Sequence, residues 1–351
     1  MFNLESNMRL KGRITKILAN FYYVCDMSNK EWECHARARL LKEGKYLLVG
    51  DDVEIELVNP NQGAVVELIQ RKNHLEKPQV ANIDQVLIVF SSLEPEIDLY
   101  NLDRYLSFVS YNLPDIKALI CVNKIDLKNT SLDKAYNDAG FKIFYVSALT
   151  GNGIEVLKPE LFDKTTVLAG PSGVGKSSLI KYFSPDEDIK IGDLSSIKTG
   201  KHITRNVRLI RIRDSKKQSF LVDTPGFTNI SFAGLNANKV LNTFKELKEL
   251  ECSFNNCLHN GYAEGCKLND KDILSKMPES RVQSYLKILD EVFSETIYGT
   301  KVETKSKIIG GKEKSKSINI PKISTKDRAI SRRKRKQNLQ KIEIEEQDET
   351  I

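Results

Sequence analysis

The sequence predicts a multidomain protein that joins a small β-barrel, an α/β domain and a helical metal-binding module. Short β-like runs broken by Gly, Asn and Asp extend from residue 8 to about residue 70, as in a closed barrel. From residue 83, apolar runs alternate with amphipathic stretches, which is typical of a parallel sheet covered by helices. Two helical stretches then flank a cluster of cysteines and a histidine. A chain of 351 residues is long enough for two or three modules with a core each.

The N-terminal barrel is expected over residues 1–75. Its β-like runs are RLKGRITKIL, FYYVCDM, KYLLVG, DDVEIELV and AVVELIQR. A five-stranded barrel of the oligonucleotide-binding type (an OB fold) suits this length, although an SH3-like barrel fits the periodicity nearly as well. Gly50 marks a tight turn before a strand. Tyr22, Tyr23 and Trp32 are able to stack on bases, but the barrel core is the commoner use of such side chains.

The α/β domain is expected over residues 76–232. Its buried-strand runs are DQVLIVFSS, KALICVNK, FKIFYVSAL, TTVLAG, VRLIRIR and SFLVDTPG, and an amphipathic stretch, NLDRYLSFVSY, separates the first two. A parallel sheet with covering helices accounts for this alternation.

A phosphate-binding loop with the pattern G-x-x-x-x-G-K-S follows the run TTVLA and precedes the apolar helical run SLIKYF. Its glycines let backbone N–H groups turn toward phosphates at a helix N-terminus, and its lysine places a cation at the β and γ phosphates. Alone, the motif indicates only a nucleoside triphosphatase. The residues assigned to the nucleotide here are Gly170, Pro171, Ser172, Gly173, Val174, Gly175, Lys176, Ser177 and Ser178.

Two motifs after other strands indicate guanine. Asn123, Lys124 and Asp126 form the tetrapeptide NKID, in which the Asp126 carboxylate pairs with two N–H groups that guanine has and adenine lacks. Ser147 and Ala148 follow FKIFYV and add a backbone N–H for the guanine oxygen. Each motif is weak alone, but together they predict GTP and GDP as ligands.

Three residues are expected to hold Mg²⁺. Ser177 supplies a hydroxyl, Asp223 of the DTPG motif binds through water, and Thr204 is a second hydroxyl ligand. The N–H group of Gly226 is able to reach the γ-phosphate.

The water-positioning group is the least defined part of the site. Phe227 follows DTPG where many GTPases keep a glutamine, and an apolar ring cannot orient water, so intrinsic hydrolysis is expected to be slow. His202 is the nearest alternative in sequence, although it is also able simply to hydrogen-bond within a switch loop.

The order of the motifs is unusual, because NKID and SA precede the phosphate loop. This order predicts a circularly permuted GTPase domain, which is feasible since domain termini often lie close together. One consequence is that DTPG leads directly into the C-terminal module, so that γ-phosphate contacts are able to reposition it.

A C-terminal helical module is expected over residues 233–298, where the helical stretches LNANKVLNTFKELKELE and PESRVQSYLKILDEVF flank the cluster. Three thiolates and an imidazole favour one structural Zn²⁺, since four protein ligands leave no open position for catalysis. The expected ligands are Cys252, Cys257, His259 and Cys266.

Residues 299–351 are expected to form a basic and largely disordered tail. Residues 301–351 carry 15 Lys and Arg against 8 Asp and Glu, whereas the first 300 residues hold 39 of each sign. Such an excess is also able simply to solubilise the chain, but we favour a polyanionic partner reached through phosphate contacts. No apolar run approaches the roughly 20 residues that span a bilayer, and no targeting segment is evident, so we expect a cytoplasmic monomer without membrane contact.

The motifs GPSGVGKSS, GKHIT and DTPGF, the permuted order, the barrel and the Cys/His cluster together resemble the bacterial ribosome small-subunit-dependent GTPase A family. The resemblance covers roughly residues 8–295. It implies a late-acting factor in small-subunit maturation, in contact with rRNA, whose GTPase activity the subunit stimulates. His202 matches the family's catalytic histidine.

The chain departs from the family pattern at two points. Ile203 stands where the family has the first of two threonines, which leaves Thr204 as the ligand. The family's last zinc spacing is H-x₅-C, whereas six residues separate His259 from Cys266 here. Two other functions stay open: an RNA-binding module that nucleotide switches with negligible turnover, and a permuted GTPase that acts on another RNA or protein.

Overall fold

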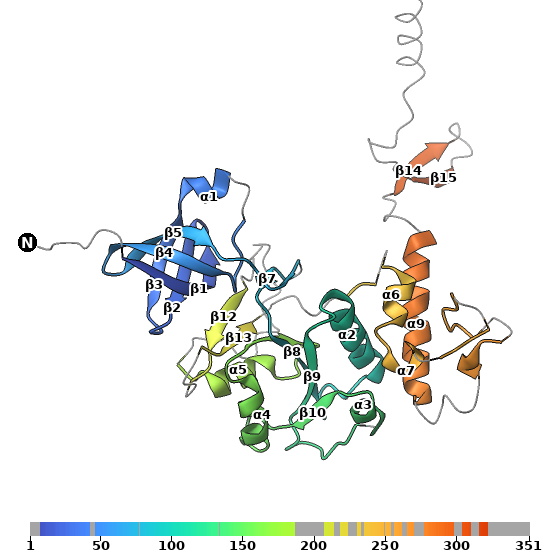
Figure 1. Cartoon of the computed structure of the whole chain (residues 1–351). Coiled ribbons are helices and arrows are strands. Elements are labelled where there is room, and N and C mark those ends of the chain that lie inside the picture. The colour runs from blue at the N-terminus through green and yellow to red at the C-terminus, as the bar shows by residue number, and fades with distance from the viewer. Residues whose placement is uncertain are drawn as a thin grey trace, which may run out of the picture. The chain divides into compact units, whose positions relative to one another are not determined.

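The computed structural model of the chain describes residues 8–42, 46–76, 78–132, 134–186, 207–213, 218–223, 230–232, 235–248, 250–253, 256–261, 265–269, 277–297, 304–309 and 316–321 (Figure 1). The chain divides into two compact units, Met1–Phe293 and Ser294–Ile351. In the second unit β14 (Thr304–Ile309) pairs antiparallel with β15 (Lys316–Pro321). The first unit holds the barrel, the α/β domain and the helical module.

The barrel strands, blue in Figure 1, close on themselves in the order β1-β2-β3-β5-β4, because β1 pairs with both β2 and β4. β3 runs parallel to β5, and α1 (Ala38–Lys42) lies between β3 and β4 in the chain. This arrangement confirms the OB fold over an SH3-like barrel. The strands are β1 (Arg9–Leu18), β2 (Phe21–Asp26), β3 (Glu31–Ala36), β4 (Asp52–Asn59) and β5 (Gln62–Leu68).

One expected barrel strand was wrong and another was missed. In KYLLVG three successive apolar side chains are buried and Val49 makes only an isolated bridge to Val80, so the run lacks the alternation of a paired strand. EWECHA forms β3 instead, with Trp32 and Cys34 pointing into the core between exposed or half-buried glutamates. Trp32 is therefore a core residue. Gly50 makes the expected turn, since its φ is 91° and an added Cβ would lie 2.2 Å from the Ala81 carbonyl oxygen.

The α/β domain contains a sheet of order β10-β9-β8-β11-β13-β12. Among these described strands, β12 alone runs antiparallel to its sheet neighbour. The run VRLIRIR was expected in a parallel sheet, but its connection to β13 is too short for the crossover that a parallel pair needs. The strands are β8 (Gln85–Ser91), β9 (Lys117–Asn123), β10 (Lys142–Tyr145), β11 (Thr165–Ala169), β12 (Arg208–Arg211) and β13 (Phe220–Asp223).

Helices cover both faces of this sheet. Ile88 of β8 packs in one apolar cluster with Leu106 of α2, whereas its neighbour Leu87 packs in another with Leu157 of α4 and Leu179 of α5. Burial on both faces explains why β8, β9 and β11 are nearly continuous apolar runs. The helices are α2 (Leu99–Asn112), α3 (Lys134–Asp138), α4 (Ile154–Leu161) and α5 (Lys176–Phe183).

The barrel attaches to the α/β domain at β12, at the start of β11 and at the residues that precede β13. Lys16 of β1 pairs with Arg208 of β12, and the Gln218 side chain donates to the Asp26 carbonyl oxygen at 2.6 Å. The Arg13 guanidinium donates to the Thr165 hydroxyl at 2.7 Å. The connection between the two domains carries β6 (His74–Leu75) and β7 (Val80–Ala81).

In the helical module, the stretch LNANKVLNTFKELKELE, expected as one helix, forms two short helices. The Thr243 hydroxyl bonds back to the Val240 carbonyl oxygen at 2.7 Å, and such side-chain bonds compete with helix propagation. None of the described helices is long and apolar enough to cross a membrane. The elements are α6 (Ala237–Leu241), α7 (Lys245–Lys248), η1 (Lys267–Asn269) and α9 (Glu279–Ile297).

A buried arginine joins this module to α2. Arg281 of α9 donates to Asp103 of α2 at 2.5 Å and to Glu246 of α7 at 2.8 and 3.2 Å. The Arg281 and Asp103 side chains are 2% and 0% exposed. Burial raises the pKa of Asp103 to about 6, against the opposing effect of the Arg281 charge. The three charges are thus held in the interior by one another.

We expect Arg281→Ala to lower the free energy of unfolding by about 3–5 kcal/mol, because two buried carboxylates would lose their shared partner. Chemical denaturation followed by circular dichroism measures this loss. Arg9 is a matched control, since its side chain is 59% exposed and lies 3.8 Å from Glu54. Arg9→Ala should cost less than about 1 kcal/mol, and equally small losses in both variants would contradict a structural role for Arg281.

Candidate nucleotide-binding and metal sites

The loop between β11 and α5 has the backbone that phosphate binding requires. Gly170 and Gly175 have φ angles of 133° and 94°, which favour glycine. A Cβ added at Gly170 would lie 2.1 Å from the Val89 carbonyl oxygen, and one at Gly175 would lie 2.2 Å from Asn123 Nδ2. α5 begins directly after Gly175, so its first N–H groups face the loop.

The Lys176 side chain turns back into this loop. Its ammonium donates to the carbonyl oxygens of Gly170 at 2.7 Å and Pro171 at 2.5 Å. Burial lowers the pKa of Lys176 to about 8, and the Asp223 carboxylate acts in the opposite direction. Lys176 follows β11 and Asp223 ends β13, and these two strands are parallel neighbours in the sheet.

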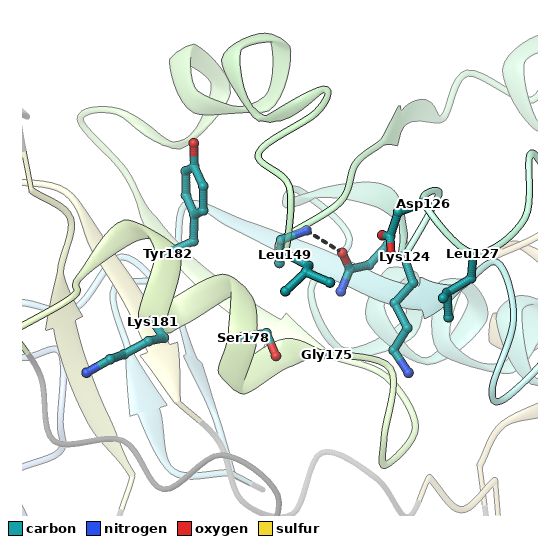
Figure 2. Close-up of a pocket in the computed structure, with 10 residues that line it drawn as sticks. Lys124, Asp126, Leu127, Leu149, Gly175, Ser178, Lys181 and Tyr182 are labelled. Carbon is teal, nitrogen blue, oxygen red and sulfur yellow. Dashed lines mark hydrogen bonds between the residues drawn. The ribbon is translucent and has the colours of Figure 1, made fainter.

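Asn123 links three parts of the site. Its amide nitrogen donates to the Val174 carbonyl oxygen of the phosphate loop at 3.0 Å. Its amide oxygen accepts from the Ala148 N–H at 3.0 Å, the bond drawn as a dashed line in Figure 2. Both polar atoms of the Asn123 amide are thus hydrogen-bonded to backbone groups, and the Asn123 side chain is buried. The described contacts of Asn123 therefore hold together the loops at this edge of the sheet, and its assignment to the purine edge stays a prediction.

Beside this link lies a pocket of about 540 Å³. In Figure 2, Lys124, Asp126 and Leu127 stand on one side, and Lys181 and Tyr182 of α5 stand on the other. The full lining comprises Asn123, Lys124, Asp126, Leu127, Ala148, Leu149, Gly175, Ser178, Lys181 and Tyr182.

Sequence reasoning missed four of these residues, although a signal was present for each. Leu127 and Leu149 directly follow the NKID and SA motifs. Lys181 and Tyr182 stand four residues after Ser177 and Ser178, which places them one turn along the same face of α5. Leu149 is 85% exposed, which is high for a large apolar side chain.

Asp223 ends β13 at the same edge of the sheet. β13 runs parallel to β11, with Val222 opposite Val167, so the carboxylate is delivered beside the start of the phosphate loop. Ser177 follows Lys176 in the first turn of α5. Arg208 of β12 lies beside Asp223, with 3.7 Å between Arg208 Nε and Asp223 Oδ2.

The remaining predicted switch residues lie outside the described residues: His202, Thr204, Gly226 and Phe227. Their assigned roles stay predictions.

The predicted metal ligands of the helical module come together in space. The ligand atoms of Cys252, Cys257, His259 and Cys266 all lie within 4.8 Å of one another. Zinc–sulfur bonds of about 2.3 Å in a tetrahedron place sulfur atoms about 3.8 Å apart, so this set fits one ion. The Cys252 sulfur lies 3.1 Å from His259 Nδ1.

Backbone N–H groups and a buried tyrosine hold the loop of the cluster in place. The N–H group of His259 points to the Cys257 sulfur at 3.4 Å, and that of Lys267 points to the Cys252 sulfur at 3.2 Å. Backbone N–H groups that point to a ligand atom orient it toward the metal. The buried Tyr285 hydroxyl of α9 donates to the Leu258 carbonyl oxygen, which anchors the loop to the module. The cluster is compatible with a structural zinc site.

The connectivity of the site distinguishes it from other P-loop GTPases. Asn123 at the end of β9 precedes the phosphate loop after β11 in the chain, yet the sheet brings both to one edge. The fold and the site therefore define a circularly permuted GTPase preceded by an OB-fold barrel.

The chain belongs to the RsgA GTPase family. The family model of the RsgA GTPase matches residues 67–233, and that of the RsgA N-terminal domain matches residues 11–65. The protein is accordingly a GTP-hydrolysing enzyme.

Relatives match over almost their full length. A Bacillus pumilus protein named small ribosomal subunit biogenesis GTPase RsgA is 37% identical over 296 residues, which cover 80% of this chain and 97% of the relative. A protein of the same name from Caldanaerobacter subterraneus subsp. tengcongensis is 37% identical over 291 residues, with 81% and 96% covered.

Two solved structures share the fold. YjeQ from Thermotoga maritima superposes with a TM-score of 0.69 at 28% identity, covering 84% of this chain and 100% of that one. YloQ, described as a circularly permuted GTPase, gives 0.67 at 27% identity, with 86% and 100% covered.

Proposed function

We propose that this enzyme hydrolyses GTP during late maturation of the small ribosomal subunit and that the subunit stimulates hydrolysis. The observation that carries the proposal is the match to relatives named for small-subunit biogenesis over 97% and 96% of their lengths. The OB-fold barrel and the excess of 15 cationic over 8 anionic residues in positions 301–351 support an rRNA partner.

The pocket beside Asn123 is the proposed guanine site. Asp126 lines it and would accept from the two guanine N–H groups, while the Ala148 N–H group, held by Asn123, lies at the same wall. The phosphate chain would then run toward Gly175 and the loop that Lys176 closes. The pocket and the loop share Gly175 and Ser178, so one nucleotide is able to occupy both.

Ser177 and Asp223 are the described residues proposed to hold Mg²⁺, together with Thr204. Their oxygen donors at the loop edge are the type that Mg²⁺ prefers, and the Lys176 cation lies beside them. Mg²⁺, when bound, neutralises charge on the β and γ phosphate oxygens. His202 is proposed to position the attacking water, because Phe227 cannot.

Asp126→Asn should lose GTP and gain xanthosine nucleotides. The amide would present an N–H group to the carbonyl that xanthine carries in place of the guanine amino group. Equilibrium binding of GDP, XDP and ADP measures the exchange, and we expect a loss of roughly 10²-fold or more for GDP. Asp115→Asn is the control, since Asp115 lies outside the pocket lining and should leave all three affinities unchanged. Equal wild-type affinity for ADP and GDP would reject this assignment.

We propose that the Cys/His cluster holds one structural Zn²⁺, and Cys257→Ser should lower the bound zinc well below about one ion per chain. Elemental analysis of the purified full chain measures this. Cys25→Ser is the control, because Cys25 lies in the barrel and not in the cluster. A Cys257→Ser protein with undiminished zinc would remove Cys257 from the ligand set.

Small ribosomal subunits should accelerate GTP hydrolysis by the full chain, and His202→Ala should lose most of that acceleration, by roughly 10²–10⁴-fold, while still binding GTP and the subunit. Steady-state phosphate release, with nucleotide and subunit binding measured in parallel, tests both parts.

Large subunits and naked rRNA are the comparison partners in this assay. Stimulation only by another RNA would favour a permuted GTPase with a different partner. Binding without stimulation by any particle would favour an RNA-binding module switched by nucleotide. Normal stimulated turnover in His202→Ala would leave the subunit assignment intact and remove His202 from the catalytic role.

A further inference from the structure

Arg208 is placed beside the carboxylate that the proposed function assigns to Mg²⁺. It begins β12 and pairs in register with Asp223 of β13. Arg208 Nε lies 3.7 Å from Asp223 Oδ2, and the two side chains are 29% and 34% exposed. Directly opposed residues of an antiparallel pair project to one face, where their side chains interact.

That face is the one covered by α5. Ile210 and Leu221 each stand two residues from the Arg208–Asp223 pair, and both pack in the same apolar cluster as Leu179 of α5. Residues two apart along a strand share a face. The Arg208–Asp223 pair is thus on the side of the sheet from which Lys176 and Ser177 begin their helix.

We propose that Arg208 is a positioning residue that orients the Asp223 carboxylate for the Mg²⁺–nucleotide complex. This inference rests on the proposed function and adds to it a residue that belongs to none of the recognised motifs. A one-third exposed carboxylate at a strand end has rotational freedom, and a cationic neighbour on the same face restricts it. In this role Arg208 acts through the Asp223 carboxylate.

Two effects of removing Arg208 oppose each other. Loss of a positive charge near the site would favour Mg²⁺, but a partly exposed pair at 3.7 Å is well screened, so this effect is small. Loss of a neighbour that orients a metal-site carboxylate typically weakens metal affinity by about 10–100-fold, and the lower end applies here because Asp223 is expected to bind Mg²⁺ through water. Weaker Mg²⁺ binding is therefore the expected net result.

The backbone of Arg208 is fixed from the opposite side by the barrel. Lys16 of β1 pairs with Arg208, and Gln218 holds the barrel carbonyl of Asp26 from the residues that precede β13. β12 is accordingly paired on both sides at the residue that reaches Asp223. This explains how a short strand is able to present a defined side-chain position.

The test measures binding of a fluorescent GDP analogue to the full chain as Mg²⁺ is titrated, and again in EDTA. Arg208→Gln should raise the Mg²⁺ concentration for half-maximal tightening by about 10-fold or more, with unchanged affinity in EDTA. Arg208→Lys, which keeps the charge, should recover most of the loss. Arg211→Gln is the matched control, since Arg211 is an exposed residue of the same strand that pairs with Phe220.

Asp223→Asn separates the two levels of inference. If it leaves the Mg²⁺ dependence unchanged, the assignment of Asp223 in the proposed function fails. The positioning role of Arg208 is overturned if Asp223→Asn weakens Mg²⁺ binding while Arg208→Gln does not. It is also overturned if Arg208→Lys fails to recover the Mg²⁺ binding that Arg208→Gln loses. An equal loss in Arg211→Gln would overturn it as well, because the effect would then come from strand stability.

Discussion

The common edge of the parallel strands is the constraint on which the site depends. β8, β9, β11 and β13 run in one direction in the sheet, so the segments that follow them gather at one edge whatever their order in the chain. Circular permutation changes which strands the chain connects and leaves this edge intact. The Asn123 amide then ties the loops together, by accepting from Ala148 and donating to Val174.

Two attachments to the α/β domain differ in physical character. The barrel reaches it through backbone pairing at Arg208 and single hydrogen bonds such as Gln218 to Asp26. The helical module reaches it through a buried charge cluster, in which Arg281 also packs against the Tyr136 ring at 5.0 Å. Breaking the Arg281 attachment would leave uncompensated charges in the protein interior. The attachment of the helical module is therefore the more rigid of the two.

Local motifs could be predicted from the sequence, whereas partners brought together by the fold could not. The phosphate loop, NKID and the Cys/His spacing each carry their chemistry within a few residues, and the described residues among them come together as expected. The buried role of Arg281 could not be predicted from its neighbours in the sequence, because its partner Asp103 is 178 positions away in the chain. Apolar content alone favours KYLLVG over EWECHA as a strand, whereas the alternation of buried and more exposed side chains marks EWECHA as the paired strand.

The link from DTPG to the helical module, noted in the sequence, has fixed points on both sides. Asp223 ends a paired strand, and the Ile230 carbonyl oxygen accepts from Arg104 of α2 at 2.8 Å. Arg104 also binds Glu291 of α9 at 2.8 and 2.9 Å, so the same guanidinium holds the start of the module and its long helix. The Arg104 and Glu291 side chains are 20% and 22% exposed, unlike the fully buried Arg281 and Asp103. The Arg104 contacts are therefore expected to break more readily than the Arg281 cluster, because a partly exposed ion pair contributes less to stability than a buried, shared one.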